Sequence, residues 1–184
     1  MLIDGDDGAD VSRETPAPEI KKPTVSIKEA TLPAVLAVTL NLRETDKAEI
    51  FGLWYEEDPE LLAEMACKST LSYVAYTSEG VPAAAFGLLE MWPGVWSAWL
   101  FGTNDFRRVG PAVAKFYHRT IIPAWIERGG HRAEARAREG HESAIKFLEK
   151  MGGVRESTLT EYGKDKANYF MYRWRPEDIK LWAK

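Results

Sequence analysis

The run RRVGPA, residues 107–112, stands where an apolar segment gives way to a long amphipathic one. Residues 95–103 predict a strand, and residues 110–128 carry apolar side chains at helical spacing. A glycine-containing loop between a strand and a helix points backbone N–H groups and the positive end of the helix dipole at one place, which suits a phosphate. Solvated surface arginines are the alternative interpretation. The residues expected to form this anion site are Arg107, Arg108, Val109, Gly110 and Ala112.

Metal binding is a second chemistry to consider, and the sequence argues against it. His118, His131 and His141 fall in a predicted helix, a strand and a loop, without a repeated ligand spacing. Cys67 is the single cysteine, so no internal disulfide forms, and its apolar helical surroundings predict a small buried residue. We expect no metal site.

The chain alternates between strand and helix patterns after its first two dozen residues, and we predict one domain over residues 25–175. Helices are expected to begin at Thr45-Asp46, at Asp58-Pro59 and at Gly110-Pro111, with a kink at Pro123, and a further helix is expected over residues 144–151. Strands are expected at residues 34–42, 71–77, 81–91, 95–103, 131–138, 154–162 and 168–174.

Capping residues mark two of these helix starts. Asp46 and Glu49 have the spacing of a capping box before an apolar run. Asp58 can cap the next helix with its carboxylate. Pro59 then stands at the first helical position, where a missing N–H costs nothing. In the later strand over residues 131–138, alanines alternate with charged residues, so one face should pack closely against a neighbour.

Composition limits the location and the partners. A net charge of -4 over 184 residues argues against binding to nucleic acid, which requires clustered Lys and Arg. No apolar run reaches membrane-spanning length, and the acidic N-terminus lacks the features of a signal peptide. Residues 1–24 predict a flexible acidic and proline-rich arm, and residues 176–184 predict a short tail.

Over roughly residues 35–174 the order of these elements resembles the GCN5-related N-acetyltransferases, the GNAT family. RRVGPA fits the family spacing Gln/Arg-x-x-Gly-x-Gly/Ala, and HRAEARAREGHESAIKFLEKMGG resembles its fifth strand and fourth helix. More narrowly, PAAAFG, WLFGT, HRAEA and EYGKDKANYFMYRW resemble phage-encoded GNAT-like proteins, including the group of the T7-type small internal virion protein. The resemblance implies an α/β (α+β) fold with a mixed, mostly antiparallel sheet of six to seven strands and about four helices. It also implies acetyl-CoA as the cofactor, with its pyrophosphate at RRVGPA.

Several positions depart from what the resemblance implies for catalysis. The predicted strand VWSAWLFGT lacks the acidic residue that often serves as base, and Leu148 stands at the usual place of an acidic tyrosine. His141 replaces an asparagine that often contacts the cofactor arm, and Gly153 replaces a phenylalanine. Pro111 has no N–H to give to a phosphate.

Substitutes for the missing acid and base can be named. Glu134 and Glu90 are candidate bases, and Tyr162 is a candidate acid. The alternatives are an ion pair for Glu134, a surface carboxylate for Glu90 and packing for Tyr162. His141 is a candidate cofactor contact, with capping of the following helix as its alternative.

The departures favour a phage GNAT-like protein that serves as a virion-associated structural or assembly component without turnover. Its partners would be other virion proteins, held through the arm and the tail, and it would move from the host cytoplasm into the virion. The alternative is an acetyl-CoA-dependent N-acetyltransferase that acts on a protein or a small amine. Neither hypothesis requires nucleic acid or a membrane span, and both are compatible with a homo-oligomer.

Overall fold

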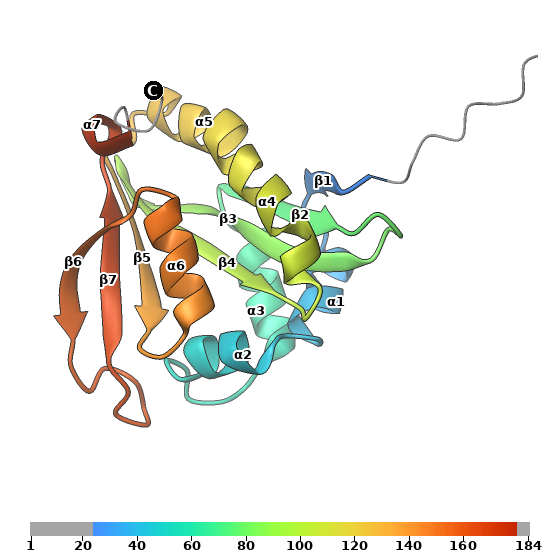
Figure 1. The fold of residues 1–184 in the computed structure, drawn as a ribbon, viewed down its shortest axis with the longest axis horizontal. Helices are drawn as coiled ribbons and strands as arrows, with labels where there is room; N and C mark the ends of the chain where they lie inside the picture. The colour runs from blue at the N-terminus through green and yellow to red at the C-terminus, as the bar shows by residue number, and fades with distance from the viewer. Residues whose placement is uncertain (1–23, 180–184) are drawn as a thin grey trace, which may run out of the picture.

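A seven-stranded sheet forms the centre of the molecule in the computed structural model, which describes residues 24–179. The strand order is β1-β2-β3-β4-β5-β7-β6 (Figure 1). Neighbouring strands are antiparallel except β4 and β5, which are parallel, so the predicted mixed sheet is confirmed. The strands are β1 (Ser26–Glu29), β2 (Leu71–Tyr76), β3 (Pro82–Trp92), β4 (Val95–Gly102), β5 (Arg132–Arg138), β6 (Val154–Leu159) and β7 (Tyr169–Trp174).

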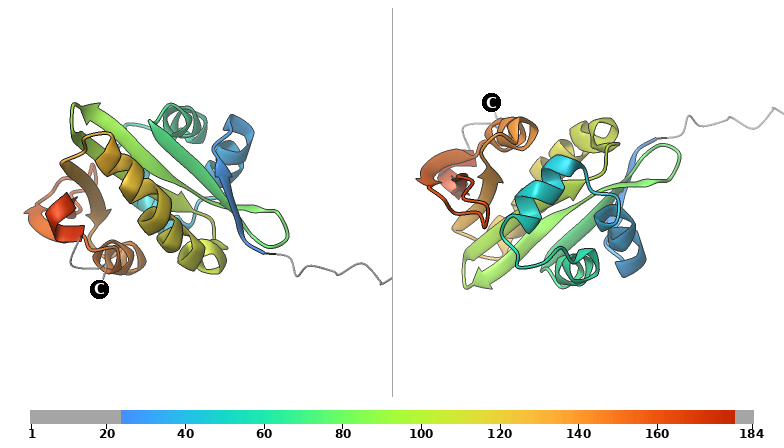
Figure 2. Two further views of the ribbon diagram at one scale, coloured as in Figure 1. Left: turned by 90° about the horizontal axis from the view of Figure 1, so that it is seen from above. Right: turned by 90° about the horizontal axis from the view of Figure 1, so that it is seen from below.

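Helices cover both faces of the sheet. Figures 1 and 2 show α4, α5 and α6 on one face and α1 and α3 on the other, while α2 lies across one end. The expected number of about four helices was too low. The helices are α1 (Leu32–Thr39), α2 (Glu44–Phe51), α3 (Pro59–Cys67), α4 (Phe106–Phe116), α5 (Ile122–Glu127), α6 (Glu142–Lys150) and α7 (Pro176–Ile179), with a π-helical turn, η1 (Tyr117–Ile121), between α4 and α5.

The first predicted strand, residues 34–42, is wrong, because this segment contains most of helix α1. A short apolar run fits a buried strand and a buried helix equally well, so its pattern does not separate them. Val35 and Val38 share one face of the helix and are fully buried against the sheet. The first strand is β1 instead, which pairs with β2 at the sheet edge.

The two predicted caps had different outcomes. Asp58 caps α3 as expected, since its Oδ1 accepts a hydrogen bond from the Leu61 N–H at 2.9 Å. The capping box at Asp46 and Glu49 was wrong. Helix α2 begins at Glu44, two residues earlier, and its N-cap residue Arg43 makes no side-chain cap. Asp46 and Glu49 therefore lie inside the helix, where their side chains are free to contact other elements.

Helix α4 also begins earlier than predicted, at Phe106 rather than at Gly110-Pro111. The turn before it starts the helix, because Thr103 accepts hydrogen bonds from Asp105 N–H through Oγ1 and from Phe106 N–H through its carbonyl. Pro111 is thus inside the helix. The N–H that it lacks would have served the helix interior and not the phosphate cradle.

A kink was predicted at Pro123, and the structure has a π-helical turn just before this residue. Residues 117–121 form η1, and Pro123 lies in the first turn of α5. The Tyr117 hydroxyl at this turn donates to the carbonyl of Trp99 at 3.2 Å. Burial raises the pKa of Tyr117, so the group is a neutral phenol at physiological pH.

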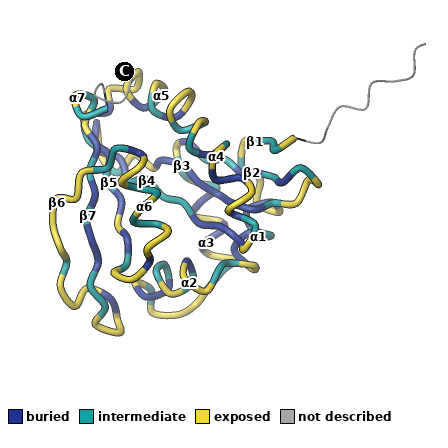
Figure 3. The backbone as a smooth tube through the Cα atoms, viewed as in Figure 1, coloured by how far each residue is buried: buried dark blue, intermediate teal, exposed yellow. Residues whose placement is uncertain are grey.

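Two apolar clusters lie on opposite faces of the sheet. The larger joins α4, α5, α6 and β7 to the sheet, and the smaller joins α1, α2 and α3 to it. The alanine face predicted for β5 is confirmed, because Ala133, Ala135 and Ala137 are buried in the larger cluster. Figure 3 shows that β7 is largely buried whereas the edge strand β6 is mostly exposed. Residues 1–23 of the predicted arm and 180–184 of the predicted tail lie outside the described residues.

Candidate active site between strands β4 and β5

Strands β4 and β5 pair over only a short stretch. The register runs from Val95 opposite Arg132 to Ser97 opposite Glu134, yet β4 continues to Gly102 and β5 to Arg138. The two strands therefore diverge, and their facing backbone groups beyond Ser97 have no partner strand. We call the paired part the closed end and the diverging part the open end.

A cavity of about 490 Å³ occupies the space between the two strands. On the face covered by α4 and α6 its walls include Phe106, Tyr117 and Leu148, and on the opposite face Trp54 and Met65. Its size falls in the range of small-molecule sites. Because residues from both faces line it, the cavity passes through the sheet where the strands separate.

Helix α2 lies across the open end of the two strands (Figure 2), and Asp46, Glu49 and Ile50 of this helix line the cavity. Arg43 N–H donates to the carbonyl of Gly102 in β4 at 3.0 Å, and the Tyr169 hydroxyl of β7 donates to the Glu49 carbonyl at 2.7 Å. Lys164 N–H donates to the Gly52 carbonyl just after the helix at 2.8 Å. Helix α2 is thus fastened to both halves of the divided sheet.

Glu49 of α2 forms the central polar contact of the open end. Its Oε2 lies 2.9 Å from Nδ1 of His141 and accepts a hydrogen bond from Arg138 N–H at 2.8 Å. The side chains of His141 and Glu49 are only 2% and 14% exposed. Among residues 24–179, Nε2 of His141 is buried without a hydrogen-bond partner. Glu49 itself lines the cavity, so a half-buried carboxylate backed by a buried imidazole faces the space between the strands.

Asp46 and Arg43 form a second buried pair beside Glu49. The Arg43 guanidinium donates to both carboxylate oxygens of Asp46, whose side chain is 2% exposed. Burial raises the pKa of Asp46, and the hydrogen bond from Arg43 opposes that rise. Arg43 also lies over the ring of Phe106 at 4.6 Å, which ties α2 to the start of α4.

The structure places the predicted phosphate-binding run at the beginning of α4, next to the cavity wall formed by Phe106. Arg107 and Arg108 are exposed there, whereas Val109 and Gly110 are buried and Ala112 is half-buried. Arg108 contacts both carboxylate oxygens of Glu79 at 2.5 Å. The hydroxyl of Thr77, followed by Arg108, lowers the pKa of Glu79 to about 2. The role of this run in binding phosphate stays a prediction.

His141 does not cap α6, so that interpretation was wrong. It is the N-cap residue of the helix, but its side chain makes no capping hydrogen bond and turns to Glu49. The position expected to contact a cofactor arm is therefore part of the buried carboxylate–imidazole pair. Leu148, the predicted replacement for an acidic tyrosine, lines the cavity.

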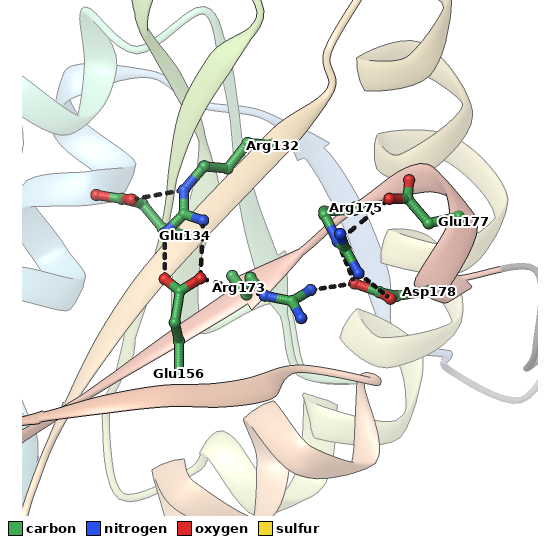
Figure 4. Close-up of polar contacts among 7 residues, drawn as sticks. All are labelled: Arg132, Glu134, Glu156, Arg173, Arg175, Glu177 and Asp178. Atoms are coloured by element: carbon green, nitrogen blue, oxygen red, sulfur yellow. Dashed lines mark hydrogen bonds and ion pairs between the residues drawn. The ribbon is translucent and has the colours of Figure 1, made fainter.

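Glu134 lies at the closed end, on the sheet face that α6 does not cover, and takes part in a network of ion pairs (Figure 4). Its Oε2 accepts from Arg132 at 3.2 Å, and Arg132 also contacts Glu156 at 2.6 Å. Glu156 in turn contacts Arg173 at 3.3 Å. The ion pair considered for Glu134 is present.

Glu90 and Tyr162 also lie away from the cavity lining. Glu90 accepts a hydrogen bond from Gly94 N–H at 3.2 Å within the β3–β4 hairpin. Tyr162 is 45% exposed, accepts from Arg136 at 2.8 Å and packs edge-on against Tyr169. The catalytic roles assigned to Glu134, Glu90 and Tyr162 stay predictions, while the structure brings other polar groups to the cavity.

The sequence analysis missed Glu49, Asp46 and Arg43 as site residues. The spacing of Asp46 and Glu49 was interpreted as a cap, although the same three-residue interval places both on one face of a helix. Two acids on one face beside apolar neighbours were the signal that could have identified them. Their partner His141 lies 92 positions away from Glu49, so the sequence offered no local trace of the pair.

Residues 24–179 contain no group of three or more His, Cys, Asp or Glu side chains that could hold a metal ion. None of their helices combines the length and the apolarity needed to cross a membrane.

No protein-family model matches the chain, and no curated protein sequence matches it significantly. Solved structures do resemble it. Ard1 from Thermoplasma volcanium has a TM-score of 0.65 at 18% identity, covering 83% of this chain and 97% of that one. The ribosomal-protein-S18-alanine N-acetyltransferase from Escherichia coli has a TM-score of 0.61 at 15% identity, covering 83% and 94%. The GNAT superfamily phosphinothricin acetyltransferase from Sinorhizobium meliloti, in complex with AcCoA, has a TM-score of 0.64 at 14% identity, covering 83% and 88%.

These similarities show that the chain has the GNAT fold, as the sequence predicts. Two of the three neighbours are acetyltransferases by name, and none of the three comes from a phage. They lend no support to the virion-associated role, which stays a prediction.

Proposed function

We propose that this protein is an acetyl-CoA-dependent N-acetyltransferase that works at the open end of the β4–β5 pair. The observation that carries the proposal is the cavity between these strands, because it passes through the sheet and reaches the buried Glu49–His141 pair. A fold alone does not establish a function, so the proposal depends on these groups.

The residues present suit the thioester arm of acetyl-CoA. The cavity wall is mainly apolar, and the diverging strands leave backbone N–H and C=O groups that the amides of the arm can bond. The N-terminus of α4, with Arg107 exposed beside it, suits the pyrophosphate. The Glu79 carboxylate at Arg108 opposes an anion there, so the arginines provide the attraction only in part.

Bound acetyl-CoA supplies an acyl carbonyl that an amine can attack as the thiolate leaves. We assign to Glu49 the removal of the amine proton, because it is the carboxylate that both lines the cavity and contacts a buried imidazole. A His141 tautomer with hydrogen on Nδ1 donates to Oε2 of Glu49 and fixes the carboxylate in place.

Protonation of the leaving thiolate requires a donor in the cavity other than Leu148. Tyr117 lines the cavity, but its hydroxyl already donates to the Trp99 carbonyl and burial raises its pKa, so it is a poor proton donor. We therefore assign protonation of the thiolate to water that enters from the solvent. The acceptor amine would enter on the opposite face, where Leu53, Trp54 and Met65 form an apolar wall next to Glu49.

Calorimetric titration of the purified protein with acetyl-CoA tests the proposal, followed by assays of thiol release with a panel of amines. We expect micromolar binding. Replacing both Arg107 and Arg108 by alanine should weaken binding, since hydrogen bonds to charged groups contribute about 1.5–3 kcal/mol each.

Glu79→Gln provides the matched control, because it keeps the shape of the side chain and removes the opposing charge. It should tighten binding rather than weaken it. Absence of any heat or thermal shift with acetyl-CoA would overturn the proposed function.

A further inference from the structure

The cavity extends beyond the space that an acetyl thioester needs. From the open end its lining continues to residues of η1, α5, β7 and α7, which belong to or pack against the apolar cluster on the helix-covered face of the sheet, over the closed end. The residues that line this extension are Ile121, Ile122, Trp125, Met151, Trp174 and Ile179. We call it the apolar branch.

Small side chains on the strands below create the apolar branch. Ala98 of β4 and Ala133 and Ala135 of β5 line the cavity with single methyl groups on the same face of the sheet. Larger residues at these positions would fill the space between the strands and the helices. Protein interiors are normally packed without such voids, so a cavity kept open at this place indicates a ligand.

The chemistry of the apolar branch admits a hydrocarbon and disfavours a polar group. All six residues that define it are apolar or aromatic, and Ile121 and Trp125 are at most 1% exposed. The indole N–H of Trp174 is bonded to the Met151 carbonyl at 3.0 Å, whereas that of Trp125 is buried without a hydrogen-bond partner among residues 24–179. A charged or strongly hydrated ligand would lose its solvation there and find at most this one N–H donor in return.

The geometry points to the apolar branch as a binding site for an acyl chain longer than acetyl, carried on coenzyme A. This inference depends on the proposed function, because it places the thioester at the open end, where the branch begins. The reaction has the same steps as acetyl transfer. The amine nitrogen bonds to the acyl carbon as the carbon–sulfur bond breaks. Glu49 takes the amine proton, and the thiolate is protonated.

Binding measurements on the full chain test the inference without relying on turnover. Calorimetric titrations compare coenzyme A with its acetyl, butyryl, hexanoyl and octanoyl thioesters. Each methylene that enters the branch should tighten binding about fourfold, the factor that corresponds to burial of one CH₂ group. Equal affinities for the acetyl and octanoyl thioesters would overturn the inference while leaving the proposed function intact.

Two variants that fill the branch sharpen the test. Ala133→Leu fills it from the paired part of β5, and Ile179→Trp fills it from the half-buried helix α7, where misfolding is a smaller risk. Both should retain affinity for the acetyl thioester and lose the gain with chain length. Ala37→Leu on α1, outside the cavity lining, is the control and should bind as the unaltered protein does.

The outcomes separate the two claims. If no thioester and no coenzyme A binds, the proposed function and this inference both fail. If longer chains bind more tightly but neither filling variant reduces the gain, the chain lies elsewhere and the inference fails alone.

Discussion

Charged side chains lie at both ends of the β4–β5 pair. Those at the closed end lie outside the cavity, whereas those at the open end line it. At the closed end Glu134 and Glu156 contact arginines near the surface, and the Glu156 side chain is 38% exposed (Figure 4). At the open end Glu49 and Asp46 have side chains 14% and 2% exposed and lie against the cavity. Similar residue types thus form a network of ion pairs at one end and line a cavity at the other.

The difference teaches that strand separation, rather than residue type, decides where chemistry can occur. Where the strands pair, Glu134 and Glu156 contact guanidinium groups away from the cavity lining. Where they diverge, helix α2 brings Asp46 and Glu49 into the lining of the cavity.

Replacing the carboxylate at each end should give the largest contrast. Glu49→Gln preserves the shape of the side chain but removes the proton acceptor, so we expect kcat for acetyl transfer to fall by about 10²–10⁴. Glu134→Gln at the closed end should leave kcat within about twofold, because Glu134 does not line the cavity. Steady-state assays at saturating acetyl-CoA measure both. If Glu134→Gln proved the more damaging change, the assignment of the base would pass to the closed end.

Stability should show a smaller contrast in the same direction. Asp46→Ala leaves the guanidinium of Arg43 buried without its partner, which is expected to lower the free energy of unfolding by about 3–5 kcal/mol. Glu156→Ala breaks exposed pairs and should cost about 1 kcal/mol or less. Urea unfolding followed by tryptophan fluorescence gives both values. Equal losses would mean that the two ends are equally solvated.

The two ends should also respond to pH with opposite signs. Burial raises the pKa of Asp46, so above its unfolded pKa the unfolded state ionises first, and the contribution of Asp46 to stability falls as pH rises. The hydrogen bond from Arg132 lowers the pKa of Glu156, so its contribution is present above the unfolded pKa and is lost as pH falls. Unfolding of Asp46→Asn and Glu156→Gln between pH 3 and pH 7, each compared with the unaltered protein, measures these slopes. Parallel slopes would contradict the comparison.

Salt should produce the smallest effect and confine it to the closed end. The Debye length shortens from about 10 Å at 0.1 M to about 3 Å at 1 M salt, which screens exposed charges and spares enclosed ones. The difference in stability between Glu156→Gln and the unaltered protein should therefore vanish at high salt, whereas that of Asp46→Ala should persist. Unfolding at the two salt concentrations tests this, and a salt-sensitive Asp46→Ala would show that water reaches Arg43.

Local sequence rules predicted the parts of the fold that local physics controls. The hairpins around Gly80 and Gly94 follow from glycine in turns, since both residues have φ of 82°. Asp58-Pro59 marked a helix start because the cap and the proline act within one turn. Residues 34–42 misled because an apolar run buried on the sheet has the same composition in a helix and in a strand.

The candidate site was less predictable because it depends on distant contacts. The Glu49 carboxylate is held in place by His141 and by the backbone N–H of Arg138, and both residues lie about half the chain away in sequence. The sequence did direct attention to His141, through its place before α6, but not to the partner of its ring. Separation of β4 from β5, which determines which charges are enclosed, is a property of the whole sheet.

The π turn between α4 and α5 sets the orientation of the helix that follows it. A π turn holds one residue more than an α-helical turn. If the same residues continued as a regular α-helix, every later side chain would be turned by about 100° around the helix axis. Trp125, which is 1% exposed, would then leave the core. The extra residue in this turn therefore keeps the wall of the apolar branch in place.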